Sequence, residues 1–132
     1  MMNRYIFIKI FAGTMIAAVV MLCACWAEGV FYKLPWVNTY DATNITRSSA
    51  IISGKIVYEG NPPYTERGVV YARTQDPTTA DNKLSVAGKD GDEFTANVKG
   101  LTANTRYYAR AYATNKAGTE YGAQVSFTTK LF

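Results

Sequence analysis

Two cysteines, Cys23 and Cys25, are the residues of this chain with the most distinctive chemistry, because a thiolate is both a nucleophile and a site of covalent modification. The sequence contains no histidine, so neither thiol has an imidazole to activate it and the commonest general acid and base is missing. We therefore expect a cysteine that is modified rather than one that catalyses. No catalytic residue and no cofactor is predicted.

The segment before the cysteines has the three-part pattern of a secretory signal peptide. Arg4 and Lys9 supply positive charge, and residues 10–22 then run as IFAGTMIAAVVML without a single charged side chain. This run is shorter than the ~20 apolar residues that a membrane-spanning helix needs. The sequence therefore predicts a leader that is cleaved, rather than a helix that stays in the membrane.

The end of this leader, Leu22-Cys23-Ala24-Cys25, resembles the bacterial lipobox, which has Leu at −3, a small residue at −1 and an acceptor cysteine. The resemblance implies that Cys25 is lipidated after cleavage behind residue 24. Cys23 does not fit as the acceptor, because Leu22 would then occupy the place of the small residue. A plain signal peptide, with two cysteines inside its apolar part, is the open alternative.

Acidic residues are the next candidates for chemistry. Asp90, Asp92 and Glu93 are the densest cluster, and such oxygen ligands could bind calcium or form a carboxylate pair. They lie around two glycines, where solvated charges of a hairpin turn are the expected explanation. The same holds for the loop that contains Asp76, Asp81 and Asn82. We predict no metal site and no glycosidase.

The charge balance does not predict a nucleic-acid partner. The full chain has a formal net charge of +4, and removal of Arg4 and Lys9 with the leader lowers it to +2. The remaining basic residues are scattered singly, so they form no basic patch that could follow a phosphate backbone. The expected partners are a membrane, through the lipid, and either a protein or a glycan, for a domain that is monomeric.

The elements that position these residues are predicted to be strands. After Pro35 no stretch has apolar residues at helical spacing, whereas several alternate with period two and are rich in Val, Ile, Thr and Tyr. Strands are expected at 35–40, 49–58, 66–73, 83–87, 93–98 and 105–114, with a last one ending at Thr129. Strands spaced at about ten residues favour a single antiparallel β-sandwich of about seven strands.

The segment 105–114 has the clearest pattern. Small or buried residues (Tyr107, Ala109, Ala111 and Ala113) alternate with larger ones (Arg106, Tyr108, Arg110 and Tyr112). The small face needs bulky partners across the core, for which Ile52, Ile56, Phe94, Val125 and Phe127 are available. On the other face, Tyr108, Arg110 and Tyr112 form a stripe that could bind a sugar or a peptide. The alternative is that the stripe packs across neighbouring strands and stabilises the sheet.

Leu101, Thr105 and Tyr107, followed by Ala113 to Gly118, resemble the Leu-x-Pro-x-Thr-x-Tyr and Ala-x-Asn-x-x-Gly motifs of fibronectin type III domains. Ala103 replaces the usual proline. The resemblance implies an immunoglobulin/fibronectin type III-like fold with a tyrosine corner, in which the Tyr107 hydroxyl bonds a backbone group a few residues upstream.

A branch of this family found in bacterial lipoproteins is similar in further segments: 66–68, 76–78, 115–122 and 126–129. The chain departs from the family in having no tryptophan in the second or third strand and no Arg-Gly-Asp triplet. The expected organisation is a signal peptide at 1–24, a lipidated tether at 25–34, the sandwich at 35–129 and a short tail at 130–132.

The function expected from these observations is that of a non-catalytic lipoprotein in the envelope of a Gram-negative bacterium. The lipid would anchor it to the outer membrane, on the periplasmic side or at the cell surface, and the sandwich would act as an interaction module or spacer. An accessory polysaccharide-binding or adhesion component is the alternative. A relation to longer proteins, in which another domain carries the activity, also stays open. These expectations on function are analogies, because one sandwich fold has many functions.

Overall fold

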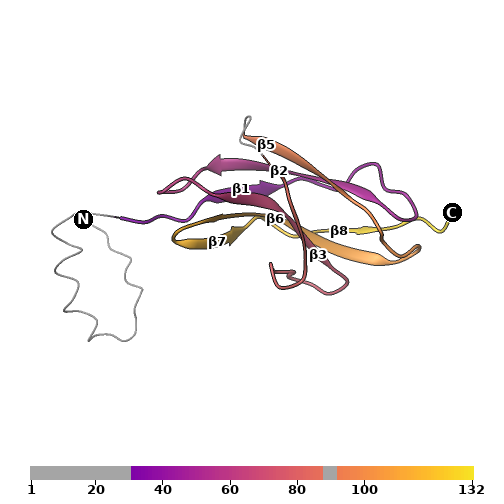
Figure 1. Ribbon diagram of the computed structural model, residues 1–132. Helices are drawn as coiled ribbons and strands as arrows, with labels where there is room; N and C mark the ends of the chain where they lie inside the picture. The colour runs from indigo at the N-terminus through magenta and orange to yellow at the C-terminus, as the bar shows by residue number, and fades with distance from the viewer. Residues whose placement is uncertain (1–30, 88–91) are drawn as a thin grey trace. The chain divides into compact units, whose positions relative to one another are not determined.

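The structure is a computed structural model that describes residues 31–87 and 92–132. The predicted leader, the predicted acceptor Cys25 and the turn that contains Asp90 lie outside these residues. All the strands belong to one compact unit, Tyr32–Phe132, which is coloured from indigo to yellow in Figure 1.

Two antiparallel sheets make up this unit, and the residues that the structure describes contain no helix. The first sheet has the order β1-β2-β5 and the second the order β4-β3-β6-β7, with β8 also paired to β6. The first is formed by β1 (Trp36–Thr39), β2 (Ala50–Tyr58) and β5 (Glu93–Val98). The second is formed by β3 (Glu66–Ala72), β4 (Asn82–Ser85), β6 (Arg106–Asn115), β7 (Gly118–Tyr121) and β8 (Val125–Thr128). The prediction of an all-β, immunoglobulin/fibronectin type III-like sandwich is confirmed.

The strand count differs from the expected seven because the last strand is divided. Its first half, β7, pairs with the end of β6, and its second half, β8, pairs with the beginning of β6. Between them the backbone at Gly122 approaches β1 so closely that a Cβ atom there would lie 2.5 Å from the Thr39 hydroxyl oxygen. Only glycine fits this approach, and the strand bends there to reach β1.

The core lies between the two sheets and has the composition that the pattern of β6 predicts. Ala109, Ala111 and Ala113 are completely buried on the inner face of β6. The bulky partners expected for them, Ile52, Ile56, Phe94 and Phe127, belong to the same buried cluster, and Val125 packs at its border. The small residues of β6 are therefore matched by large ones on β2 and β5 of the other sheet and on the neighbouring strand β8, as close packing requires.

Strand boundaries differ from the predicted ones by one or two residues. The largest difference is at β4, which ends at Ser85 rather than at residue 87, although the Val86 amide still donates a hydrogen bond to the Arg67 carbonyl oxygen. Such differences at the ends of elements are ordinary.

In the part of the chain that the structure covers, no helix is both long and apolar enough to cross a membrane.

Candidate functional site

Tyr107 begins the inner face of β6 and is almost fully buried. Its hydroxyl oxygen accepts a hydrogen bond of 2.9 Å from the backbone amide of Thr102, five residues upstream. The ring stacks on Phe127 of β8, with the ring centroids 5.8 Å apart. We call this arrangement the tyrosine corner, because the phenol connects the loop before β6 to the core.

The environment of Tyr107 has opposing effects on its acidity. Burial would raise the pKa of the phenol, but the hydrogen bonds from Thr102 and the nearby Arg73 guanidinium together lower the pKa of Tyr107 below its ordinary value. These groups stabilise the phenol oxygen as an acceptor. With its ring packed on Phe127 and its hydroxyl bound to the Thr102 amide, Tyr107 has a structural role.

The other two residues of the motif extend the corner. Leu101 is buried, and its amide donates to the Ser48 carbonyl oxygen over 2.9 Å. The Thr105 hydroxyl donates to the Ala103 carbonyl oxygen over 2.9 Å. A third threonine, Thr129, is buried and donates to the Thr102 carbonyl oxygen over 2.6 Å. Thr129 was not predicted to be a site residue, and only its place at the end of the last strand could have indicated this role.

The stripe of Tyr108, Arg110 and Tyr112 lies on the outer face of β6, where the alternation of the sequence puts it. Arg110 makes two contacts within the domain. Its Nε donates to the Pro77 carbonyl oxygen over 2.9 Å, and its guanidinium carbon lies 4.2 Å from the centre of the Tyr121 ring. This is a cation–π contact at short range. Tyr108 is half-buried beside it.

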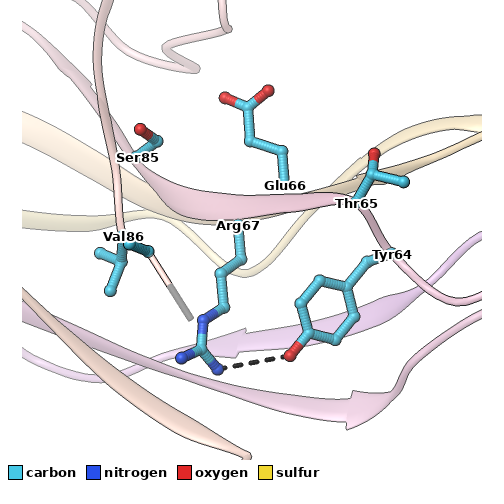
Figure 2. Close-up of a pocket in the computed structure, with 7 residues that line it drawn as sticks. Tyr64, Thr65, Glu66, Arg67, Ser85 and Val86 are labelled. Carbon is cyan, nitrogen blue, oxygen red and sulfur yellow. Dashed lines mark hydrogen bonds between the residues drawn. The ribbon is translucent and has the colours of Figure 1, made fainter. Parts of the chain in front are cut away.

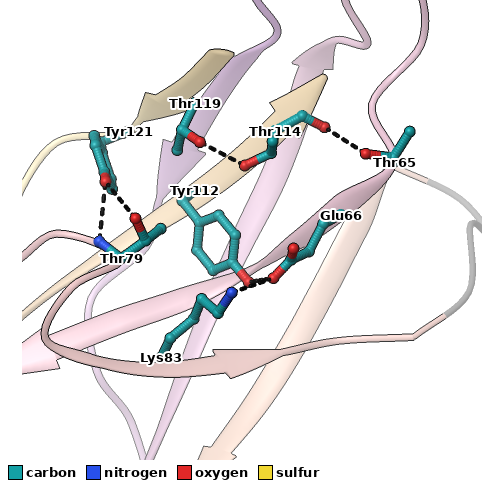
Figure 3. A network of polar contacts seen from close by, with 8 residues as sticks. All are labelled: Thr65, Glu66, Thr79, Lys83, Tyr112, Thr114, Thr119 and Tyr121. Atoms are coloured by element: carbon teal, nitrogen blue, oxygen red, sulfur yellow. Dashed lines mark hydrogen bonds and ion pairs between the residues drawn. The ribbon is translucent and has the colours of Figure 1, made fainter. Parts of the chain in front are cut away.

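Tyr112 has no exposed surface at all, although it is on the outer face. Figure 3 shows its hydroxyl donating to the Glu66 carboxylate, which also binds the Lys83 ammonium at 3.0 Å. Burial raises the pKa of Tyr112 far above its ordinary value, and the Glu66 carboxylate raises it further. Conversely, the hydrogen bond from Tyr112 and that from Lys83 lower the pKa of Glu66, against the smaller effect of burial.

The loop at 74–81 covers this face of the sheet. The Tyr121 hydroxyl oxygen accepts a hydrogen bond of 3.0 Å from the Thr79 amide, which fastens the loop to β7 (Figure 3). Pro77 of this loop accepts a hydrogen bond from Arg110, and Thr79 donates one to Tyr121. The loop therefore packs against the outer face of the sheet at these two residues. Tyr112 is fully buried and Arg110 contacts Pro77 and Tyr121, so these two residues of the stripe are occupied by contacts within the domain.

A cavity of about 260 Å³ lies between the beginning of β3 and the end of β4. Residues 64–67 and 85–87 line it. Figure 2 shows Arg67 extending from β3 beside Tyr64, whose hydroxyl oxygen is 3.4 Å from a guanidinium nitrogen. Arg67 is only 4% exposed, and its guanidinium carbon lies 5.0 Å from the centre of the Phe94 ring. The alternation of β3 places Arg67 on the same face as Val69, so the sequence pattern contains a signal for its burial.

Among the acidic residues that were considered for metal binding, Asp81 has a local structural role. Among residues 31–87 and 92–132, no three carboxylates or cysteines come together as a metal site would require. The Asp81 carboxylate accepts a hydrogen bond of 2.8 Å from the Thr78 amide, which closes the loop at 74–81. Asp92 and Glu93 are exposed at the start of β5, and Asp90 is not described.

Solved structures with a similar fold include the sensor domain of the anti-sigma factor RsgI4 from Pseudobacteroides cellulosolvens. Two forms of this domain match with TM-scores of 0.55 and 0.56 and are 20% and 21% identical to this chain. Each covers 74% of this chain, and the match covers 96% and 91% of their own lengths. A redesigned β-sandwich protein matches with a TM-score of 0.50 and 24% identity over 76% of this chain and 97% of its own.

No protein-family model matches the sequence, and no curated protein matches it either. The likeness to solved structures therefore concerns the fold: this chain has the β-sandwich that those domains share.

Proposed function

We propose that this chain is a lipoprotein of a Gram-negative cell envelope, attached to the outer membrane through Cys25, and that its sandwich is a non-catalytic interaction module or spacer. The observation that carries the proposal is the sequence Leu22-Cys23-Ala24-Cys25 directly behind a charge-free apolar run. A thioether at Cys25 would fix the domain to a membrane surface through a tether of a few residues.

The chemistry of the described domain supports a module without catalysis. Its two buried tyrosines of β6 are occupied by structural partners: Tyr107 by the Thr102 amide, and Tyr112 by Glu66. The buried cation Arg67 stacks on aromatic rings of the core. These contacts stabilise the fold, which is compatible with a module that does not catalyse a reaction.

The likeness to sensor domains of an anti-sigma factor is compatible with a module that presents a surface to a partner. For the alternative, a polysaccharide-binding component, the stripe of Tyr108, Arg110 and Tyr112 would have to meet the glycan. The burial of Tyr112 and the engagement of Arg110 by Pro77 favour the interaction or spacer role.

Metabolic labelling with a fatty acid tests the proposal. The full-length chain, produced in a Gram-negative host, should incorporate the label and be recovered with the membranes. Cys25→Ala should abolish the label, whereas the matched variant Cys23→Ala should keep it. Label that persists in Cys25→Ala, or that is lost only in Cys23→Ala, would show that the acceptor is assigned incorrectly.

A further inference from the structure

The described domain leaves an unusual group of large apolar side chains in contact with solvent at one end. Tyr32, Leu34, Trp36, Val57 and Tyr58 are each between 42% and 60% exposed. Single exposed apolar residues are normal on protein surfaces, but a contiguous group is typical of an interaction site. We call this group the aromatic end.

Several contacts bring these residues together. Trp36 of β1 is the pairing partner of Tyr58 of β2, and a register irregularity after Trp36 places Val57 beside the pair. Leu34 lies close to the turn between β6 and β7, since a Cβ atom at Gly118 would be 3.4 Å from a Leu34 methyl carbon. Figure 1 shows the beginning of β1, the end of β2 and the strand β7 at the same end of the sandwich.

The backbone beneath the aromatic end is held by hydrogen bonds. Lys33 and Asn61 exchange two backbone bonds of 2.8 and 3.0 Å. The buried Asn115 side chain donates to the carbonyl oxygens of Lys33 and Pro62, at 2.6 and 2.8 Å. The exposed side chains are therefore presented on a fixed platform, which lowers the entropy that binding would cost.

The charges at this end suit a lipid surface better than an apolar protein core. Lys33 and Lys116 are exposed, and the Lys116 ammonium lies 5.6 Å from the centre of the Tyr32 ring. Glu59, next to Tyr58, is an exposed acidic residue at this end, and Glu120 lies on β7. Tyrosine and tryptophan next to lysine are the residues that favour the headgroup region of a bilayer, where one part of the ring is in apolar and the other in polar surroundings.

The position of the proposed acceptor cysteine indicates that the surface next to the aromatic end is a membrane. Residues 26–31 separate Cys25 from Tyr32. Even a fully extended chain of this length spans at most about 25 Å. A lipid on Cys25 would thus keep the aromatic end, where the chain enters the sandwich, close to the bilayer that holds the lipid.

We propose that the aromatic end lies on the headgroups of the membrane to which Cys25 is anchored, so that the domain stands on the bilayer in one orientation. The inference rests on the proposed lipid anchor and adds to it: the lipid supplies attachment, and the aromatic end supplies orientation. The opposite end of the sandwich, with the C-terminus, then points away from the membrane (Figure 1).

Fluorescence of Trp36 tests this inference on the full-length chain, processed in a bacterial host and reconstituted into vesicles of phosphatidylethanolamine and phosphatidylglycerol. The substitution Trp26→Phe makes Trp36 the sole tryptophan. Lipids with brominated acyl chains should quench at least about half of its intensity, and the vesicles should shield it from aqueous iodide, as expected for a ring at the interface.

Two variants complete this test. The triple substitution Tyr32→Ser, Leu34→Ser and Tyr58→Ser should reduce quenching by brominated lipid and raise quenching by iodide. The matched control, Leu131→Ser with Phe132→Ser, removes exposed apolar side chains from the other end and should change neither value. Circular dichroism of each variant verifies that the sandwich is folded.

Flotation of the vesicles separates the possible failures. Protein that floats with the vesicles but shows no quenching by brominated lipid would overturn the inference and leave the anchor intact. Protein that does not float would overturn both. Shielding of Trp36 from iodide without lipid quenching, accompanied by a dimer in detergent, would show that a second copy covers the aromatic end, and would also overturn the inference.

Discussion

The two ends of the sandwich differ in the burial of their aromatic residues. At the end where β6 begins, the Tyr107 ring is buried, its hydroxyl accepts from the Thr102 amide, and Thr129 ties the same loop to the last strand. We call this the latched end. At the aromatic end, Trp36 and Tyr58 are paired on neighbouring strands and exposed.

This difference indicates that one end of the domain stabilises the fold and that the other is available for contact with a partner. Residues at the latched end contribute free energy of folding because their polar groups are paired out of water. Residues at the aromatic end leave apolar surface in water, which contributes nothing to folding and is available to another surface. Substitutions at the two ends should therefore affect different measurements.

The largest effect on stability is expected from Tyr107→Phe at the latched end. It removes the acceptor of the Thr102 amide while keeping the ring on Phe127, and should lower the free energy of unfolding by about 1–2 kcal/mol. Urea unfolding followed by circular dichroism measures this. The control Tyr32→Phe at the aromatic end should change it by less than about 0.5 kcal/mol, and equal losses in both would remove the distinction between the ends.

Thr129→Val should have the next largest effect, about 1 kcal/mol. Its hydroxyl donates to the Thr102 carbonyl oxygen and accepts from the Thr105 amide at 3.0 Å, and valine keeps the shape but neither bond. The exposed neighbour Thr128→Val is the control. In a double-mutant cycle with Tyr107→Phe the two losses should be non-additive, because both residues hold the same loop. Strict additivity would mean that the latched end is not one unit.

A smaller effect is expected from Tyr112→Phe, about 0.5–1 kcal/mol. Tyr112 lies further along β6 towards the aromatic end, and its hydroxyl is bound to a carboxylate that water can partly reach. Glu66 also retains Lys83 as a partner in this variant. Urea midpoints of Tyr112→Phe and Tyr107→Phe, measured together, give the comparison, and a greater loss for Tyr112→Phe would contradict it.

Stability on the acid side should depend on Glu66. Because its pKa is lowered in the folded state, Glu66 contributes stability that is present above its unfolded pKa of about 4.3 and is lost as the pH falls through the lower, folded pKa. Glu66→Gln should therefore lose less stability than the wild type between neutral pH and the acid range. The contribution is small because Lys83 and Glu66 are both partly exposed. An unchanged pH profile of the urea midpoint would refute it.

The smallest effect on stability is expected from Trp36→Ala, below about 0.5 kcal/mol. Trp36 is 60% exposed, so the loss of its ring removes little packing. A loss of more than about 1 kcal/mol would mean that the ring is part of the core, and the distinction between the two ends would fail.

Much of the sandwich could be predicted because strand patterns are local. The alternation in β6 indicated its buried face, and four of the five residues expected to fill the core beside its alanines belong to the buried cluster, with Val125 packed against it. The division between β7 and β8 could not be predicted, since it depends on the approach of Gly122 to β1, a contact between segments far apart in the sequence.

The surroundings of the outer stripe were harder to predict for the same reason. Alternation placed Tyr112 on the outer face, where exposure would be expected. Its hydroxyl is bound to Glu66 of β3, which also binds Lys83 of β4, so its surroundings come from two other strands. Arg67 shows the opposite case: period two puts it on the inner face, and the aromatic rings of Tyr64 and Phe94 make this position tolerable for a cation.

The most direct test of the central claim, that the two ends of the domain have different roles, is a map of lipid contacts on the protein that carries the proposed anchor. Vesicles that contain lipids with a photoactivatable diazirine on the acyl chain would be crosslinked to the full-length, processed chain, and the attachment sites located by mass spectrometry. If the aromatic end lies on the membrane, crosslinks are expected within residues 32–36, 57–59 and 116–118 of the domain. Crosslinks at 100–105 or 129–132 instead, or none on the domain at all, would contradict the claim.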